Sequence, residues 1–143
     1  MKYVILVSHG VFAQGLQSAV LMMSGNRDDV LSTSLEDGMS TEVFRENFEK
    51  LVGSFSENDE VLLFSDILSG SPFTISLDVL DQKNLLDNTM VFSGMNMPMV
   101  LTAVLMKDNL EGEVLKETIL EEARLGVTYF DPKAVDLDTE EEL

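Results

Sequence analysis

The sequence contains no cysteine and only one histidine, His9. Without cysteine, the chain cannot form disulfides, thiolate nucleophiles or zinc–sulfur sites. A single histidine also excludes metal sites of the His-Glu-x-x-His type. The sequence has no uninterrupted run of about 18 apolar residues and no signal-peptide pattern, so we expect a cytoplasmic protein whose link to any membrane is indirect.

Basic residues are scarce as well, since nine Lys and Arg stand against 26 Asp and Glu, for a formal net charge of −17. Binding to the phosphates of nucleic acid needs a clustered basic face, so we expect no nucleic-acid partner. An acidic chain instead favours basic protein partners. Part of the charge lies in residues 135–143, which we expect to be a solvated acidic tail, whereas residues 1–134 fit one ordinary domain.

Short apolar runs alternate with stretches of helical spacing along the chain. The apolar runs predict strands at residues 3–10, 30–35, 60–64 and 89–93. Apolar residues three or four apart predict helices at residues 12–23, 41–55, 98–106 and 113–125, and a further helix with Ser71 as its N-cap and Pro72 as its first residue. We therefore predict an α/β fold with a mostly parallel sheet, four parallel strands plus an antiparallel edge strand at residues 127–130, covered by helices on both faces.

Polar residues gather where the predicted strands end, at Ser8-His9-Gly10, at residues 66–71 and at residues 94–98. The first and third strands can be neighbours in right-handed winding, which would bring His9 beside Asp66. A carboxylate that accepts a hydrogen bond from Nδ1–H leaves Nε2 of the ring unprotonated and nucleophilic. Ser71 and the free N–H groups of the helix that begins there would hold the oxygens of a phosphoryl group.

A lone histidine near a strand end is as often a structural residue as a reactive one, so the surrounding residues decide between the two. The sequence has no Gly-Lys phosphate-binding motif of the nucleotide-dependent kind. A nucleophilic histidine beside an anion-binding helix end, without a nucleotide or metal motif, indicates a phosphohistidine relay that needs no cofactor.

Three segments together resemble the enzyme IIA component of the mannose family: Ser8-His9-Gly10, Asp66 followed by Gly70-Ser71-Pro72-Phe73, and Gly94-Met95-Asn96-Met97-Pro98-Met99. That family belongs to the bacterial phosphoenolpyruvate-dependent sugar phosphotransferase system, and the resemblance covers nearly the whole chain. It implies that His9 accepts phosphate from the carrier protein HPr and passes it to enzyme IIB, with Asp66 as the partner of His9.

The resemblance carries further expectations. Gly70 and Ser71 are the expected phosphate-binding residues, and no metal or cofactor takes part. The family resemblance also implies a homodimer in which the final strand is exchanged between subunits, and only indirect links to the membrane components IIC and IID. Family members often have two adjacent glycines before the Ser-Pro pair, whereas Ser69 stands at the first of these positions here.

Alternatives from other classes remain. A histidine phosphatase would need a basic pocket and a second histidine, which the composition does not supply. The phosphotransfer subunit that serves dihydroxyacetone kinase shares the fold and the relay, and the segment from Gly70 to Phe73 argues against it. A non-catalytic regulatory module that senses phosphorylation has the same residues, and transfer of phosphate to a cognate IIB distinguishes relay from sensor.

Overall fold

Four parallel strands form one sheet in the order β2-β1-β3-β4. The strands are β1 (Lys2–His9), β2 (Val30–Leu35), β3 (Glu60–Ser65) and β4 (Thr89–Phe92). The helices are α1 (Phe12–Ser24), α2 (Thr41–Leu51), α3 (Ser71–Gln82), α4 (Met97–Met106) and α5 (Gly112–Leu125), with a 3₁₀ turn η1 at Leu86–Asn88. The structure, a computed structural model, describes residues 1–134, so the predicted tail at 135–143 lies outside the described residues. The predicted α/β fold with four parallel strands is confirmed.

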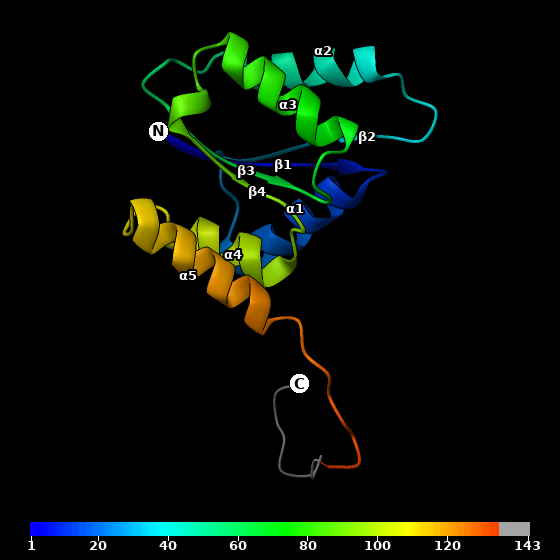
Figure 1. Cartoon of the computed structure of the whole chain (residues 1–143), viewed down its shortest axis with the longest axis vertical. Coiled ribbons are helices and arrows are strands. Elements are labelled where there is room, and N and C mark those ends of the chain that lie inside the picture. Colours follow the sequence, from blue (N-terminus) through cyan, green and yellow to red (C-terminus); the bar gives the residue numbers. More distant parts are fainter. Residues whose placement is uncertain (135–143) are drawn as a thin grey trace.

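Helices cover both faces of the sheet (Figure 1), with α2 and α3 on one face and α1, α4 and α5 on the other. Successive side chains of β1 point to opposite faces, so Val4 and Leu6 pack with α1, α4 and α5, whereas Ile5 and Val7 pack with α2 and α3. The central strands are therefore buried on both faces, which explains why their sequences are unbroken apolar runs. Among the described residues, no helix combines the length and the apolar character needed to cross a membrane.

Side chains and loops define where the helices begin. Ser40 is the N-cap of α2 and accepts a hydrogen bond from the Val43 N–H at 3.2 Å. The N-cap predicted for α3 is wrong by one residue, because Gly70 occupies that position and Ser71 is already helical. Pro72 fits either position, since the N–H groups at the start of a helix have no partner within it.

The predicted antiparallel strand at residues 127–130 does not form in the single chain. After α5 the chain leaves the body of the molecule (Figure 1), and the side chain of Tyr129 is 85% exposed. The end of α5 contacts the start of α4: Asn96 Nδ2 donates to the Ala123 carbonyl at 3.0 Å, and a Cβ on Gly126 would lie 2.7 Å from Pro98 Cγ. Residues 127–130 therefore start beside the first turn of α4 and do not pair with β4.

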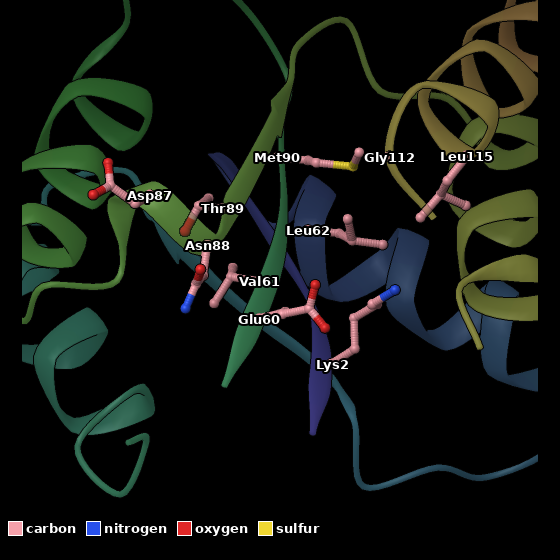
Figure 2. A pocket seen from close by; sticks show the side chains of 10 residues that line it. All are labelled: Lys2, Glu60, Val61, Leu62, Asp87, Asn88, Thr89, Met90, Gly112 and Leu115. Carbon is pink, nitrogen blue, oxygen red and sulfur yellow. The ribbon is translucent and has the colours of Figure 1, made fainter. Parts of the chain in front are cut away.

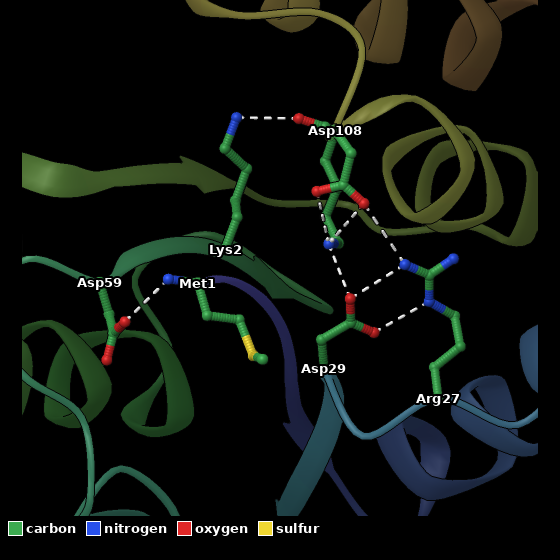
Figure 3. A network of polar contacts seen from close by, with 7 residues as sticks. Met1, Lys2, Arg27, Asp29, Asp59 and Asp108 are labelled. Atoms are coloured by element: carbon green, nitrogen blue, oxygen red, sulfur yellow. Dashed lines mark hydrogen bonds and ion pairs between the residues drawn. The ribbon is translucent and has the colours of Figure 1, made fainter.

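An ion network closes the end of the sheet opposite His9 (Figure 3). Lys107 is only 2% exposed, and its Nζ lies 2.7 Å from Asp29 Oδ2. Arg27 Nε lies 2.9 Å from the other oxygen of Asp29, and Lys2 donates to the Lys107 carbonyl at 2.9 Å. The hydrogen bond from Arg27 outweighs the effect of partial burial and, with Lys107, holds the pKa of the Asp29 carboxyl well below its ordinary value. The network ties the starts of β1 and β2 to the end of α4.

Candidate active site

The predicted pair of His9 and Asp66 comes together at the carboxyl ends of the two central strands. The pairing of β1 with β3 ends at Val7 and Ser65. His9 is the last residue of β1 and still pairs with Leu35 of β2, and Asp66 directly follows the last residue of β3. The Nδ1 atom of His9 is 2.9 Å from Asp66 Oδ2. The sequence prediction that parallel neighbours would bring these residues together is correct.

Asp66 is held in place by three hydrogen bonds. Its Oδ2 accepts from the backbone N–H of His9 at 2.9 Å as well as from the ring, and its Oδ1 accepts from the Ile67 N–H at 2.9 Å. Partial burial acts to raise the pKa of the Asp66 carboxyl, but the hydrogen bonds from His9 and Ile67 together lower that pKa below its ordinary value. Asp66 is therefore ionised at neutral pH.

The ionised carboxylate determines the tautomer of the ring. A carboxylate without a proton cannot donate, so the hydrogen bond between Asp66 and His9 requires a proton on Nδ1. In the neutral ring Nε2 then carries the free lone pair. The His9 side chain is 45% exposed, so a partner can reach the ring.

The start of α3 lies directly against the imidazole. A Cβ built on Gly70 would be 2.9 Å from Cε1 of His9, so Gly70 and the ring are in contact. Cε1 is bonded to both ring nitrogens, and Nδ1 faces Asp66, which leaves Nε2 as the nitrogen available to a group at this helix end. No side chain caps α3 within the described chain, and Pro72 has no N–H, so the free donors are those of Ser71 and Phe73. Such a helix end favours an anion.

Ser8 is a site residue to which the sequence analysis assigned no role. It is fully buried, it pairs in register with Ser34 of β2, and the two hydroxyl oxygens are 3.0 Å apart. Its Oγ also accepts a hydrogen bond from the Ala13 N–H at 2.7 Å, and so replaces the missing side-chain cap of α1. Ser8 thus joins two strands and a helix directly beneath His9. The only signal in the sequence is a polar residue at the end of an otherwise apolar run.

The third expected strand end, residues 94–98, has a structural role. Asn96 accepts from the Met99 N–H at 2.9 Å as the N-cap of α4, and its amide group donates to Ala123. The Met95 N–H donates to the carbonyl of Ser65 at 3.1 Å, which holds this turn against β3. No hydrogen bond links residues 94–98 to His9 or Asp66 in the part of the chain that the structure describes.

Exposed apolar residues follow both members of the pair in the sequence. Val11 and Phe12 follow the His9-Gly10 turn, Ile67 and Leu68 follow Asp66, and all four are exposed. We call these four residues the apolar rim. Exposed apolar residues that gather around a polar centre are typical of a surface that contacts another protein.

A hollow of about 210 Å³ lies elsewhere, at the opposite end of the sheet (Figure 2). Its walls include the first residues of three strands, Lys2, Glu60 and Thr89, together with Leu115 of α5. It shares no lining residue with the His9 site and has no part in the chemistry considered below.

The chain is similar to known proteins. The sequence model of the EIIA-man family, described as the PTS system fructose IIA component, matches residues 3–120. The PTS system fructose-specific EIIA component of Bacillus subtilis (strain 168) is 23% identical over 110 residues, which cover 77% of this chain and 73% of that protein.

Solved structures with the same fold include two of similar size. The phosphotransferase system component EIIA from Streptococcus agalactiae is 27% identical, with a TM-score of 0.75 over 97% of this chain and 99% of that one. The mannose/sorbose-specific IIA subunit from Enterococcus faecalis is 21% identical, with a TM-score of 0.72 over 92% of this chain and 96% of that one, and it supports the fold alone. Because the family model spans most of the sequence, the chain belongs to the EIIA-man family of phosphotransferase-system IIA components.

Proposed function

We propose that the protein is a phosphohistidine carrier that accepts a phosphoryl group from HPr on Nε2 of His9 and transfers it to enzyme IIB, which serves sugar uptake and phosphorylation. The observation that carries this proposal is the 2.9 Å contact between His9 Nδ1 and Asp66 Oδ2, beside the start of α3. The family places the chain among phosphotransfer components of sugar transport. The residues supply a nucleophile, its orienting carboxylate and an anion-binding helix end.

The proposed transfer conserves atoms and charge, because the phosphoryl group leaves the imidazole ring of the donor and joins the ring of His9. The lone pair of His9 Nε2 forms a P–N bond while the P–N bond to the donor imidazole breaks and its electron pair returns to the donor ring. Nδ1 keeps its proton, so the phosphorylated ring is positive and faces the Asp66 carboxylate. Transfer between two histidines is nearly balanced, so alignment and charge stabilisation matter more than a strong base. The phosphoryl oxygens would face Gly70 and Ser71.

The apolar rim is the proposed contact surface for both HPr and IIB. The two partners must each bring a reactive group to the same Nε2, so they use the same face in turn. The chain carries a net charge of −17, which favours basic partners and speeds their encounter. In this proposal the protein works in the cytoplasm and meets the membrane components IIC and IID only through IIB.

A homodimer is the proposed assembly. The outer edge of β4 is unpaired within the described chain, and a hollow of about 280 Å³ beside it is lined by Met90, Val91 and Leu120. Residues 127–130 leave the molecule close to Ser93, just past the end of β4. Four extended residues span about 13 Å, enough to pair with a strand of this length. We propose that residues 127–130 of a second copy pair with β4.

Sedimentation tests the dimer. We expect a dimer at micromolar concentration, and we expect deletion of the residues after Leu125 to weaken association without unfolding the helices. A monomer at this concentration in the full chain would contradict the proposed strand exchange.

The relay is tested with radioactive phosphoenolpyruvate, enzyme I and HPr. The protein should acquire an acid-labile label that disappears from it when a cognate IIB is added, and His9→Ala should acquire none. A label that HPr delivers but no IIB removes would favour the regulatory sensor. A label delivered only by the components of dihydroxyacetone kinase would favour that alternative, which the family match does not support.

A further inference from the structure

Two adjacent residues in the loop before α3 have backbone conformations opposite to what their side chains lead one to expect. Ser69 has a φ of +68°, in the left-handed region that favours glycine. Gly70 has φ −78° and ψ 168°, an extended conformation that any residue adopts. The backbone alone therefore gives no reason for glycine at position 70.

The reason lies in the space around Gly70. A Cβ at this position would be 2.9 Å from His9 Cε1 and 3.4 Å from both Cδ1 and Cγ1 of Ile67. Real Cβ atoms essentially never approach another heavy atom to 2.9 Å, so a methyl group would displace its neighbour. The imidazole thus contacts Asp66 through Nδ1 and lies against the bare α-carbon of Gly70 at the neighbouring ring atom, Cε1.

We propose that Gly70 is a positioning residue for His9: its missing side chain leaves the space in which the ring rests on the start of α3 while Nδ1 contacts Asp66. The left-handed turn at Ser69 brings Gly70 against the ring. The position of Gly70 against the ring follows from the contacts alone, whereas the effect of Gly70 on phosphoryl transfer rests on the proposed function. Ring displacement would break the 2.9 Å hydrogen bond that determines the tautomer.

The test compares Gly70→Ala with Gly15→Ala. Gly15 lies in α1 with nothing within 4 Å of its would-be Cβ, so it is a matched control for the added methyl group. Because His9 is the only histidine, the ring signals of protein labelled with ¹⁵N-histidine belong to this residue alone. We expect the Nδ1–H tautomer in the wild type and in Gly15→Ala, and a mixture of both tautomers in Gly70→Ala.

The rate of phosphoryl acceptance from HPr is the second measurement. A reacting group displaced by about 1 Å can lose on the order of 100-fold in rate, so we expect Gly70→Ala to be about 10- to 100-fold slower and Gly15→Ala to be unchanged. Ser69→Gly should keep the wild-type tautomer. The double variant Ser69→Gly/Gly70→Ala should recover part of the rate, because the loop can then yield in place of the ring.

The outcomes separate the two proposals. A folded Gly70→Ala variant with the wild-type tautomer and rate would overturn the positioning role. A wild-type protein that HPr fails to phosphorylate would overturn the proposed function, while a tautomer change in Gly70→Ala would still support the positioning role. Gly70 lies in a loop with an ordinary backbone conformation, so we expect the variant to fold. If it does not fold, the tautomer and the rate are measured on the double variant, and wild-type values of both would overturn the positioning role.

Discussion

Asp66→Asn removes the charge beside His9 while keeping the size of the side chain. In the wild type, Oδ2 accepts from the N–H and the ring of His9, and Oδ1 accepts from the Ile67 N–H. Asparagine has one acceptor oxygen, so its NH₂ group must face either Ile67 or both donors of His9. The first orientation loses one hydrogen bond and the second loses two, so the oxygen should stay on His9. The ring then keeps its position but loses the negative charge opposite it.

The expected slowing of phosphate acceptance follows from the lost negative charge. A hydrogen bond to a charged group contributes about 1.5–3 kcal/mol, against about 0.5–1.5 kcal/mol for one between neutral groups, and each ~1.4 kcal/mol added to the barrier slows a reaction tenfold. The carboxylate should stabilise the positive ring mainly during transfer, so we expect Asp66→Asn to accept phosphate about 5- to 15-fold more slowly than the wild type. His9 should remain the phosphorylated residue.

Rapid-quench measurement of transfer from radioactive phospho-HPr, with one turnover at neutral pH, gives this rate. Asp78→Asn is the matched control, because Asp78 lies on α3 and its 2.8 Å pair with Arg45 is on the surface. Such pairs contribute little, so the control should stay within about twofold of the wild type. If Asp66→Asn also stayed within about twofold, the carboxylate would not stabilise the transfer and the assigned role of Asp66 would be wrong.

Three further variants test other parts of the account. Asp29→Asn should lower the free energy of unfolding in urea by about 3 kcal/mol at neutral pH, because it leaves the buried Lys107 short of a counter-charge. The pKa of Asp29 is lowered on folding, so the difference in unfolding free energy between the wild type and Asp29→Asn should be fully present above the ordinary pKa of about 4. The difference should shrink as the pH falls below that value, and a difference that stays constant with pH would contradict the role of Asp29. Leu68→Glu should raise the KM for phospho-HPr with little change in kcat, because it alters only the apolar rim, and a fall in kcat alone would contradict a docking role. Truncation after Ala134 should leave phosphate acceptance unchanged, and its loss from a folded truncated protein would show that residues 135–143 take part.

The sequence predicted those features that depend on periodicity and on strand order. Unbroken apolar runs indicated strands buried on both faces, and the carboxyl ends of parallel neighbours meet at one edge, so the approach of His9 to Asp66 could be predicted. The strand predicted at residues 127–130 is absent from the single chain because strand formation needs a hydrogen-bonding neighbour. In the proposed dimer that neighbour belongs to another copy.

Other features of the site had no pattern from which to be predicted. The hydroxyl of Ser8 contacts both Ser34, its partner in the sheet, and the Ala13 N–H at the start of α1. No spacing in the sequence indicates that these two contacts meet at one side chain. The family resemblance marks Gly70 as an expected phosphate-binding residue, whereas its proposed role in positioning His9 depends on a contact with a side chain more than 60 positions earlier in the chain. Contacts of this kind follow only from the packed structure.

The most direct measurement is to identify the atom that carries the phosphoryl group. Protein labelled with ¹⁵N-histidine is phosphorylated with phosphoenolpyruvate, enzyme I and HPr, and long-range ¹H–¹⁵N spectra then report both ring nitrogens of His9, the only histidine in the chain. The account predicts phosphorus bonded to Nε2 and a proton retained on Nδ1, facing Asp66. Phosphate on Nδ1, on Ser71 or on Asp66, or label that persists in His9→Ala, would contradict it.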